Sequence, residues 1–165
     1  MRIGRVLTPV LLAAVLALSA CGAGSAGDGT GEGTELGDLT SANTETPGCP
    51  FTAKQVSEII GQPMTDQGTC SFGDGKGVAG LTVTTASELA GGMTFDYQRD
   101  QAGKTYAKVV DLDHGDRGYL AVKDIQAEAV VVSSKGSYTL IMSSFSFDEA
   151  KYDSVLRKLL DVVFG

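Results

Sequence analysis

The chain has 165 residues, and its 20 acidic and 13 basic side chains give a formal net charge of −7 at neutral pH. This balance provides no basic footprint for nucleic acid or for anionic lipid head groups, so it excludes binding to either through a positive surface. Once a long polar segment near the N-terminus is set aside, the remaining length suits one domain with one core.

The first 20 residues have the organisation of a signal peptide. Arg2 and Arg5 precede an apolar run over residues 6–18, which is shorter than the roughly 20 residues that a membrane span needs. The motif LSAC, ending at Cys21, resembles the lipobox of bacterial lipoproteins. The resemblance implies cleavage after residues 1–20, a diacylglyceryl anchor on Cys21, and a location on the extracytoplasmic side of the cell membrane. The alternative is an ordinary secretory signal followed by a chance cysteine.

Residues 22–47 form a polar segment rich in Gly, Ser and Thr. The segment has five acidic residues and no Lys or Arg, and its large apolar residues are Leu36 and Leu39. Such a composition buries too little apolar surface to offset the entropy of ordering the chain. We therefore predict a lipidated cysteine and flexible tether over residues 21–47, followed by a globular domain over residues 48–165.

Cys49 and Cys70 are the two cysteines that remain if Cys21 carries lipid. Disulfides persist outside the cytoplasm, and closing this loop is worth about 3 kcal/mol in the chain-entropy model. Metal binding is the rival interpretation. However, the chain has no CxxC motif and a single histidine, His114, so no ligand spacing indicates zinc. We predict a disulfide and no metal.

The first elements of the domain have clear local signals. Thr52 and Gln55 fit a capping box, and Gly61 is a typical helix end. Residues 70–87 then indicate a hairpin whose turn is GDGKG. The glycines of residues 75–80 spell GxGxxG, but a β-type segment follows them where a dinucleotide site needs a helix. We therefore predict that these glycines serve the hairpin turn and bind no dinucleotide.

The sequence of the second half of the domain predicts strands between two helices. Residues 93–103 indicate a helix ending at Gly103, residues 105–112 look extended, and DHGDRG is a turn. Strands are predicted over residues 119–123, 127–133 and 138–147, with residues 134–136 linking the last two. The runs Val130 to Val132 and Leu140 to Met142 are apolar on both faces, which is typical of central strands covered on both sides.

The last helix is indicated by an N-terminal cap and a broad apolar stripe. Asp148 is the cap, and the stripe recurs at helical spacing through Tyr152, Val155, Leu156, Leu159, Leu160 and Val163. The polar face is not basic enough to suggest a helix lying on a membrane. The order helix, hairpin, helix, strands, helix predicts an α+β domain in which helices flank an antiparallel sheet.

The domain also resembles a group of uncharacterised actinobacterial envelope lipoproteins. The residues that carry the resemblance are Cys49, Thr52, Val56, Gly61, Cys70 with Phe72, and the turn Gly115-Asp116-Arg117-Gly118-Tyr119. The chain differs from the group in having Phe72 where tryptophan is usual and Gly118 where alanine is commoner. The resemblance implies a PsbP-like sheet flanked by helices and brings no catalytic residues with it.

Signals for chemistry are sparse. His114 lies among Asp111, Asp113 and Asp116, and no GxSxG elbow supplies a nucleophile for it, so we expect a solvated turn histidine. The same carboxylates could meet Ca²⁺, but the EF-hand pattern fails because Gly115 occupies a ligand position. Paired carboxylates for glycoside hydrolysis leave no local pattern, and none is indicated here.

These observations predict a domain that is not an enzyme and uses no cofactor. The favoured function is a membrane-anchored interaction domain that meets another envelope protein. The alternative is a binding module for a small or lipidic ligand between helix and sheet, with ligand residues that the sequence does not identify. A hydrolase using carboxylates or His114 is a third alternative. An apolar cavity of several hundred Å³ would favour the ligand, whereas a filled core would favour the protein partner.

Overall fold

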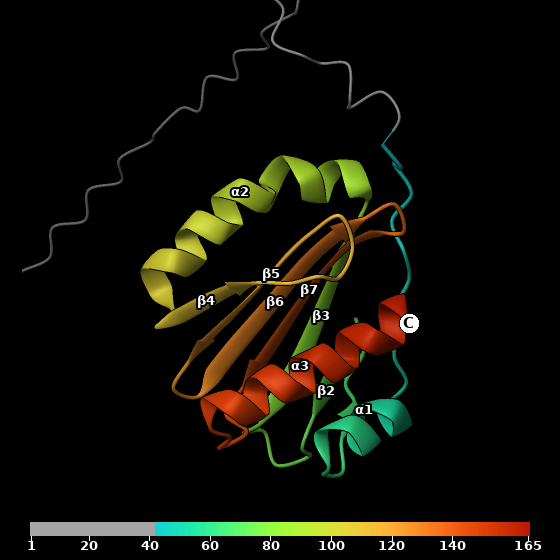
Figure 1. Cartoon of the computed structure of the whole chain (residues 1–165). Coiled ribbons are helices and arrows are strands. Elements are labelled where there is room, and N and C mark those ends of the chain that lie inside the picture. Colours follow the sequence, from blue (N-terminus) through green and yellow to red (C-terminus); the bar gives the residue numbers. More distant parts are fainter. Residues whose placement is uncertain (1–41) are drawn as a thin grey trace, which may run out of the picture. The chain divides into compact units, whose positions relative to one another are not determined.

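The computed structural model describes residues 42–165, which form a seven-stranded sheet and three helices. The predictions for the signal peptide, for Cys21 and for most of the tether lie outside the described residues. Every neighbouring pair of strands is antiparallel, and the sheet order is β1-β2-β3-β7-β6-β5-β4. The predicted class, a mixed fold with an antiparallel sheet and helices, is confirmed (Figure 1).

The elements have the following bounds in chain order: α1 (Ala53–Ile60), β1 (Thr65–Asp66), β2 (Ser71–Gly73), β3 (Gly80–Ala86), α2 (Glu88–Thr105), β4 (Lys108–Asp111), β5 (Arg117–Lys123), β6 (Gln126–Ser133), β7 (Gly136–Ser143) and α3 (Glu149–Phe164). Strands β1 to β3 form one meander and β4 to β7 form another. Helix α2 connects the two meanders, and the pairing of β3 with β7 joins them into one sheet.

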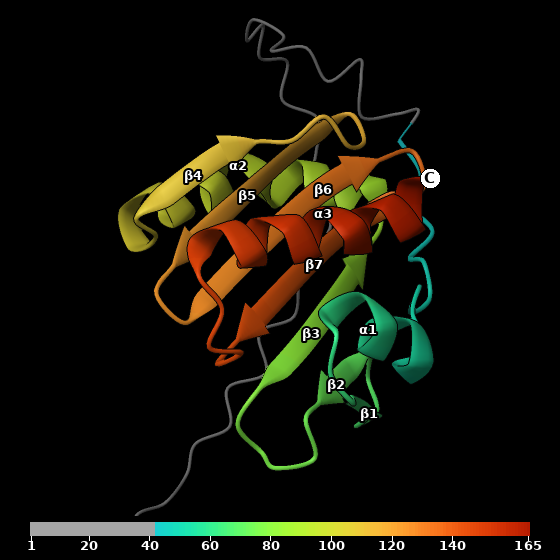
Figure 2. The ribbon, with the colours of Figure 1, turned by 60° about the horizontal axis from the view of Figure 1, so that its bottom comes forward.

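The helices lie on both faces of the sheet. Helix α2 covers one face, and α1 and α3 cover the other (Figure 2). The larger core lies on the α1 and α3 side, where Val56, Leu140 and Leu156 are fully buried. The smaller core lies under α2 and consists of Phe95, Ala102, Tyr119, Ala121, Val130 and Val132. Because Val131 belongs to the larger core and its two neighbours to the smaller one, β6 is covered on both sides, as its apolar run predicts.

Helix α2 covers only part of its face of the sheet. It packs on β4 to β7, whereas Thr82 and Thr84 of β3 lie on the same face and are exposed. One helix is about 10 Å wide, while strands are spaced about 4.8 Å apart, so a single helix cannot cover seven strands. The boundary between the covered and the open part of this face is where the candidate site lies.

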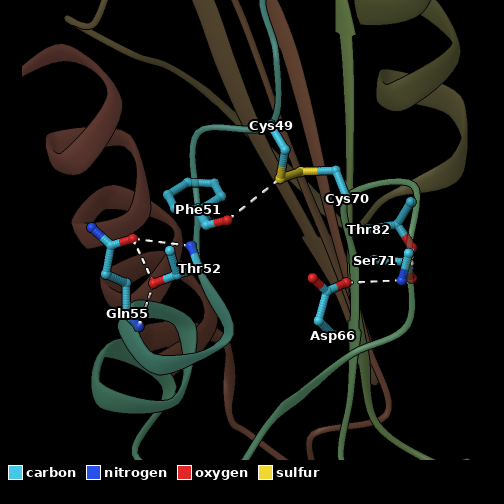
Figure 3. Close-up of a disulfide and its surroundings, with 9 residues drawn as sticks. Cys49, Phe51, Thr52, Gln55, Asp66, Cys70, Ser71 and Thr82 are labelled. Carbon is cyan, nitrogen blue, oxygen red and sulfur yellow. Dashed lines mark hydrogen bonds between the residues drawn. A yellow bond between two sulfur atoms is a disulfide. The ribbon is translucent and has the colours of Figure 1, made fainter.

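The start of the domain is fixed by a helix cap and a disulfide (Figure 3). The Thr52 N–H donates to Gln55 Oε1 at 2.9 Å, and the Gln55 N–H donates to the Thr52 hydroxyl at 3.3 Å, which confirms the capping box. Gly61 ends α1 in the left-handed conformation, with φ of 84°. The predicted bond between Cys49 and Cys70 is present, and the two Cα atoms are 5.4 Å apart. It links the chain before α1 to the start of β2.

Helix α2 is longer than residues 93–103, so this prediction is wrong at both ends. The helix begins after its cap, Ser87, includes Gly91 and Gly92, and continues two residues beyond Gly103. A Cβ on Gly91 would lie 2.1 Å from Cβ of Ser137 on β7, so the glycine is what lets the helix lie this close to the sheet. Tertiary packing here outweighs the low helix propensity of glycine.

Two short stretches also differ from the prediction. Strand β1 was not predicted, because its two residues are both exposed and give no alternation of apolar and polar side chains. The strand expected from Tyr138 through Phe147 ends at Ser143, and Ser144 and Ser146 have positive φ in the loop that follows. The Tyr152 hydroxyl fixes this loop, because it donates to the carbonyl of Ile125 at 2.8 Å and accepts from the N–H of Phe145 at 3.2 Å.

The last residues of the expected tether contact the domain. The Asn43 N–H donates to the Glu88 carboxylate at 2.8 Å, and the Asn43 carbonyl accepts from the N–H of Leu89 at 3.2 Å. The Asn43 side chain donates to the carbonyl of Ser134 at 3.2 Å. Residues 43–47 therefore lie against the start of α2 and the β6–β7 turn, and the domain begins before residue 48. Within residues 42–165, no helix has both the length and the hydrophobicity to span a bilayer.

The adjacent glycines of α2 provide a matched pair of stability variants. Gly91→Ala should lower the free energy of unfolding by about 1–3 kcal/mol, because the added methyl group overlaps Ser137. Gly92→Ala meets nothing within 4 Å and should raise it by up to about 1 kcal/mol through better helix propensity. Urea denaturation measures both values. Equal effects at the two positions would contradict the close approach of α2 to β7.

Candidate functional site

A pocket of about 260 Å³ lies between α2 and the sheet. The helix contributes Tyr97, Gln98, Gln101, Ala102 and Thr105, and the remaining lining consists of Tyr106, Glu128, Val130 and Thr139. Successive residues on one side of α2 face the pocket because they recur at helical spacing. Tyr106 follows the end of the helix, and β6 and β7 provide the floor.

Glu128 is the charged residue of this pocket. It lies on β6 in register with Ala121 of β5 and Ile141 of β7, and it is half-buried. The hydroxyl of Tyr119, which is fully buried, donates to Glu128 Oε1 at 2.5 Å. This short bond to a carboxylate is charge-assisted, and it satisfies a hydroxyl that would otherwise be buried without a partner.

Two tyrosines have raised pKa values around this carboxylate. Burial, followed by the charge and hydrogen bonding of Glu128, raises the pKa of Tyr106 to about 12. Burial, followed by the hydrogen bond to Glu128, raises the pKa of Tyr119 still further. Both hydroxyls are therefore protonated at neutral pH and are available to Glu128 as donors.

No basic side chain of the described residues pairs with Glu128. Within residues 42–165, no nitrogen of Lys, Arg or His lies within 4.0 Å of its carboxylate. Arg99, which lies near Tyr119, is paired instead with Asp111 at 2.6 Å. The pocket thus contains a half-buried carboxylate with hydroxyl donors and no counter-charge from the part of the chain that the structure describes.

Two other hollows of similar volume hold charges that are exposed to solvent or bonded to the backbone. The first lies beside Asp111, Asp116 and Arg117, and its Arg117 is paired with Asp96. The second lies beside Asp74 in the β2–β3 turn, where the Asp74 carboxylate accepts from the N–H groups of residues 76, 78 and 79. Glu128 is distinguished by being half-buried with no basic partner among residues 42–165, which makes the α2 pocket the candidate site.

His114 is not the solvated histidine that the sequence suggests. Its side chain is 19% exposed, its Nε2 lies 3.0 Å from a carboxylate oxygen of Asp161, and its ring packs near Phe164 of α3. Its buried Nδ1 has no hydrogen-bond partner among the described residues. The bond to Asp161 links the β4–β5 loop to α3. No hydroxyl or thiol is bonded to this histidine in that part of the chain, so the geometry shows no nucleophile for it.

The predicted acidic cluster does not converge on one point. Asp111 pairs with Arg99, and the N–H of Asp116 donates to the carbonyl of Val132. Within residues 42–165, no group of three or more His, Cys, Asp or Glu side chains is arranged to hold a metal ion. Of the GxGxxG glycines, Gly75 and Gly77 lie in the β2–β3 turn with positive φ, and Gly80 begins β3. A strand follows them, as predicted, and not the helix that a dinucleotide site needs.

Sequence reasoning missed Glu128, although a signal for it exists. The segment AEAVVVS contains one charged residue in a strand that is otherwise predicted to be central and covered on both sides. A charge in such a strand requires a partner or a route to solvent. Its partner, Tyr119, could have been inferred only from the β5–β6 register, which places the two residues diagonally on one face.

Alkaline titration tests the coupling between Glu128 and the tyrosines. Unfolded tyrosine has a pKa near 10, so the stability that protonated Tyr106 and Tyr119 contribute is complete below pH 10 and is lost as pH rises towards 12. Glu128→Gln should let Tyr106 ionise closer to pH 10, because the negative charge is removed. Tyrosinate absorbance measures this shift. An unchanged profile would mean that burial alone holds the tyrosines protonated.

No protein-family model matches the chain, and neither a curated protein nor a solved structure matches it. The resemblance of the domain to actinobacterial lipoproteins and to the PsbP-like fold therefore stays a prediction, and a function has to be derived from the residues of this chain.

Proposed function

We propose that the chain is a lipid-anchored extracytoplasmic binding protein that holds a small ligand between α2 and the sheet. The observation that supports this most is the half-buried carboxylate of Glu128, which opens into a pocket and has no basic partner among the described residues. Keeping an unpaired charge partly out of water is unfavourable. A ligand group that pairs with the carboxylate would offset this cost.

The anchor is supported by the sequence LSAC at Cys21 after an apolar run that is too short to span a membrane. Asn43, at the start of the described residues, is bonded to Glu88 at the first turn of α2. The pocket residues Tyr97 to Thr105 lie roughly 13 to 26 Å further along the helix, at 1.5 Å per residue.

Binding without catalysis agrees better with the groups in the pocket. Its lining offers a carboxylate, tyrosine and threonine hydroxyls and amides, and the described residues place no histidine, cysteine or serine in it. His114 bonds to Asp161 of α3, and α3 lies on the opposite face of the sheet. The base that meets a hydroxyl at this pocket is Glu128, and its partner Tyr119 is fully buried with a raised pKa, which makes that hydroxyl a poor nucleophile.

An envelope protein partner is the second candidate. Met93 and Tyr97 are one turn apart on α2 and are 71% and 69% exposed, so they form a small apolar strip beside the pocket. This strip favours a docked protein on the same surface. A lipidic ligand has less support, because about 260 Å³ falls below the usual 300–1,000 Å³ of drug-sized ligand sites.

The anchor is tested by Cys21→Ala. The variant should lose lipid attachment, because no other cysteine follows the apolar run directly. We expect an uncut precursor or release from membranes, which fractionation and mass spectrometry of the N-terminus measure. Continued membrane association with loss of the first 20 residues would contradict the lipid anchor.

The pocket is tested by native mass spectrometry of the chain purified from its own envelope. We expect a small-molecule adduct on the native protein and its loss in Gln101→Trp, whose indole would fill the pocket from α2. The matched control is Gln126→Trp, on an exposed residue of β6 that does not line the pocket. An adduct that persists in Gln101→Trp would contradict a ligand in this pocket.

The same experiment distinguishes a bound small ligand from a docked envelope protein. A protein-sized adduct that Met93→Ser removes, while Gln101→Trp and Gln126→Trp behave alike, would replace the ligand function with a docked envelope protein. In that outcome the apolar strip of Met93 and Tyr97 is the binding surface, and the pocket is incidental to it.

A further inference from the structure

The charge of the pocket restricts what it can bind, provided that the proposed function holds. Of the described residues that line it, Glu128 alone carries a charge, and that charge is negative. An anionic ligand would meet a repulsive carboxylate and no Lys or Arg from the lining. Coulomb interactions are stronger at a half-buried site than in water, so the sign of this charge matters more here than on an exposed surface.

The free hydrogen-bonding capacity of Glu128 gives a second restriction. An ionised carboxylate has about four acceptor positions. Tyr119 occupies one at 2.5 Å, and the single hydroxyl of Tyr106 can occupy one more. The remaining positions need donors, and the described residues provide no cation for them. An ammonium group has three N–H donors and a positive charge, so it supplies both.

The walls of the pocket favour the same chemistry. Tyr97 and Tyr106 present aromatic rings, whose faces attract cations within about 6 Å of the ring centre. The side-chain oxygens of Gln98 and Gln101 can accept N–H groups that do not point at Glu128. Val130, Ala102 and the methyl group of Thr139 provide apolar surface for the rest of the ligand.

A metal ion fits these groups poorly. Calcium requires six to eight oxygen ligands, usually with several carboxylates, and this pocket has one carboxylate. A sugar or another neutral polyol could donate hydroxyl groups to Glu128, but it would leave the charge uncompensated. From the charge, the free acceptor positions and the aromatic walls together, we propose that the pocket binds a small organic cation, with an ammonium group facing Glu128 and an apolar body against Tyr97.

Three probes of similar shape and different charge test this inference. They are benzylamine, benzyl alcohol and benzoate, titrated into the full chain in detergent at neutral pH and followed by NMR shifts of Tyr97, Gln101, Tyr106 and Glu128. We expect benzylamine to bind at least tenfold more tightly than benzyl alcohol. Benzoate should leave these residues unshifted.

Glu128→Gln should weaken benzylamine binding at least tenfold, because it removes the charge while keeping an acceptor for Tyr119. Glu58→Gln is the matched control. Glu58 is an exposed glutamate of α1 on the opposite face of the sheet, beside Lys54, and its loss should change the affinity less than about twofold. Should Glu128→Gln fold poorly, Tyr97→Leu at an exposed position keeps the test intact, with an expected loss of at least threefold.

The outcomes separate this inference from the proposed function. Equal binding of benzylamine and benzyl alcohol, unchanged by Glu128→Gln, would overturn the cation inference and leave the pocket as a site for an uncharged ligand. Failure of all three probes to shift the pocket residues would also overturn the cation inference. The loss of the native adduct in Gln101→Trp would still support a ligand pocket in either case.

Discussion

The pairing of β3 with β7 is the constraint on which the rest of the structure depends. Its register runs from Gly80 with Ser143 to Ala86 with Ser137, so 51 to 63 residues separate the partners. Every other pair of neighbouring strands in the sheet is consecutive in the chain. Bringing β3 and β7 together has an entropic cost that local hairpins avoid. Burial of Leu81 and Leu140 at this junction, together with a seven-residue ladder, offsets that cost.

This pairing also explains why a pocket exists. With β3 beside β7, the chain must cross the sheet to reach β4 at the far edge, and α2 makes that crossing. Gly91 brings the start of the helix close to Ser137, while bulkier residues line its second half. One helix cannot cover the whole face, so a half-buried strand residue such as Glu128 keeps access to solvent. The position of the site follows from topology, and its charge follows from one side chain.

Features that depend on neighbours in the chain could be predicted, and features that depend on distant contacts could not. The capping box of Thr52 could be predicted from a short spacing, and the disulfide of Cys49 from the count of cysteines left once Cys21 carries lipid. The start of α2 could not be predicted, because Gly91 is required there by its close approach to Ser137 of β7, which is 46 positions later in the chain. His114 was misread for a similar reason, since Asp161 comes from the other end of the domain. The charge of Glu128 within the apolar run of β6 was visible in the sequence, but Tyr119, diagonal to it on β5, was not.

The disulfide also determines how the domain would carry mechanical tension. A pull on the chain before residue 42 would first load the hydrogen bonds of Asn43 and then reach Cys49. From there the covalent path runs through the sulfur atoms to Cys70 and into β2, so residues 50–69 form a closed loop outside the line of force. Helix α1 and strand β1 would be shielded, and the load would pass to the β2–β3 hairpin and its ladder with β7, where many backbone hydrogen bonds share it.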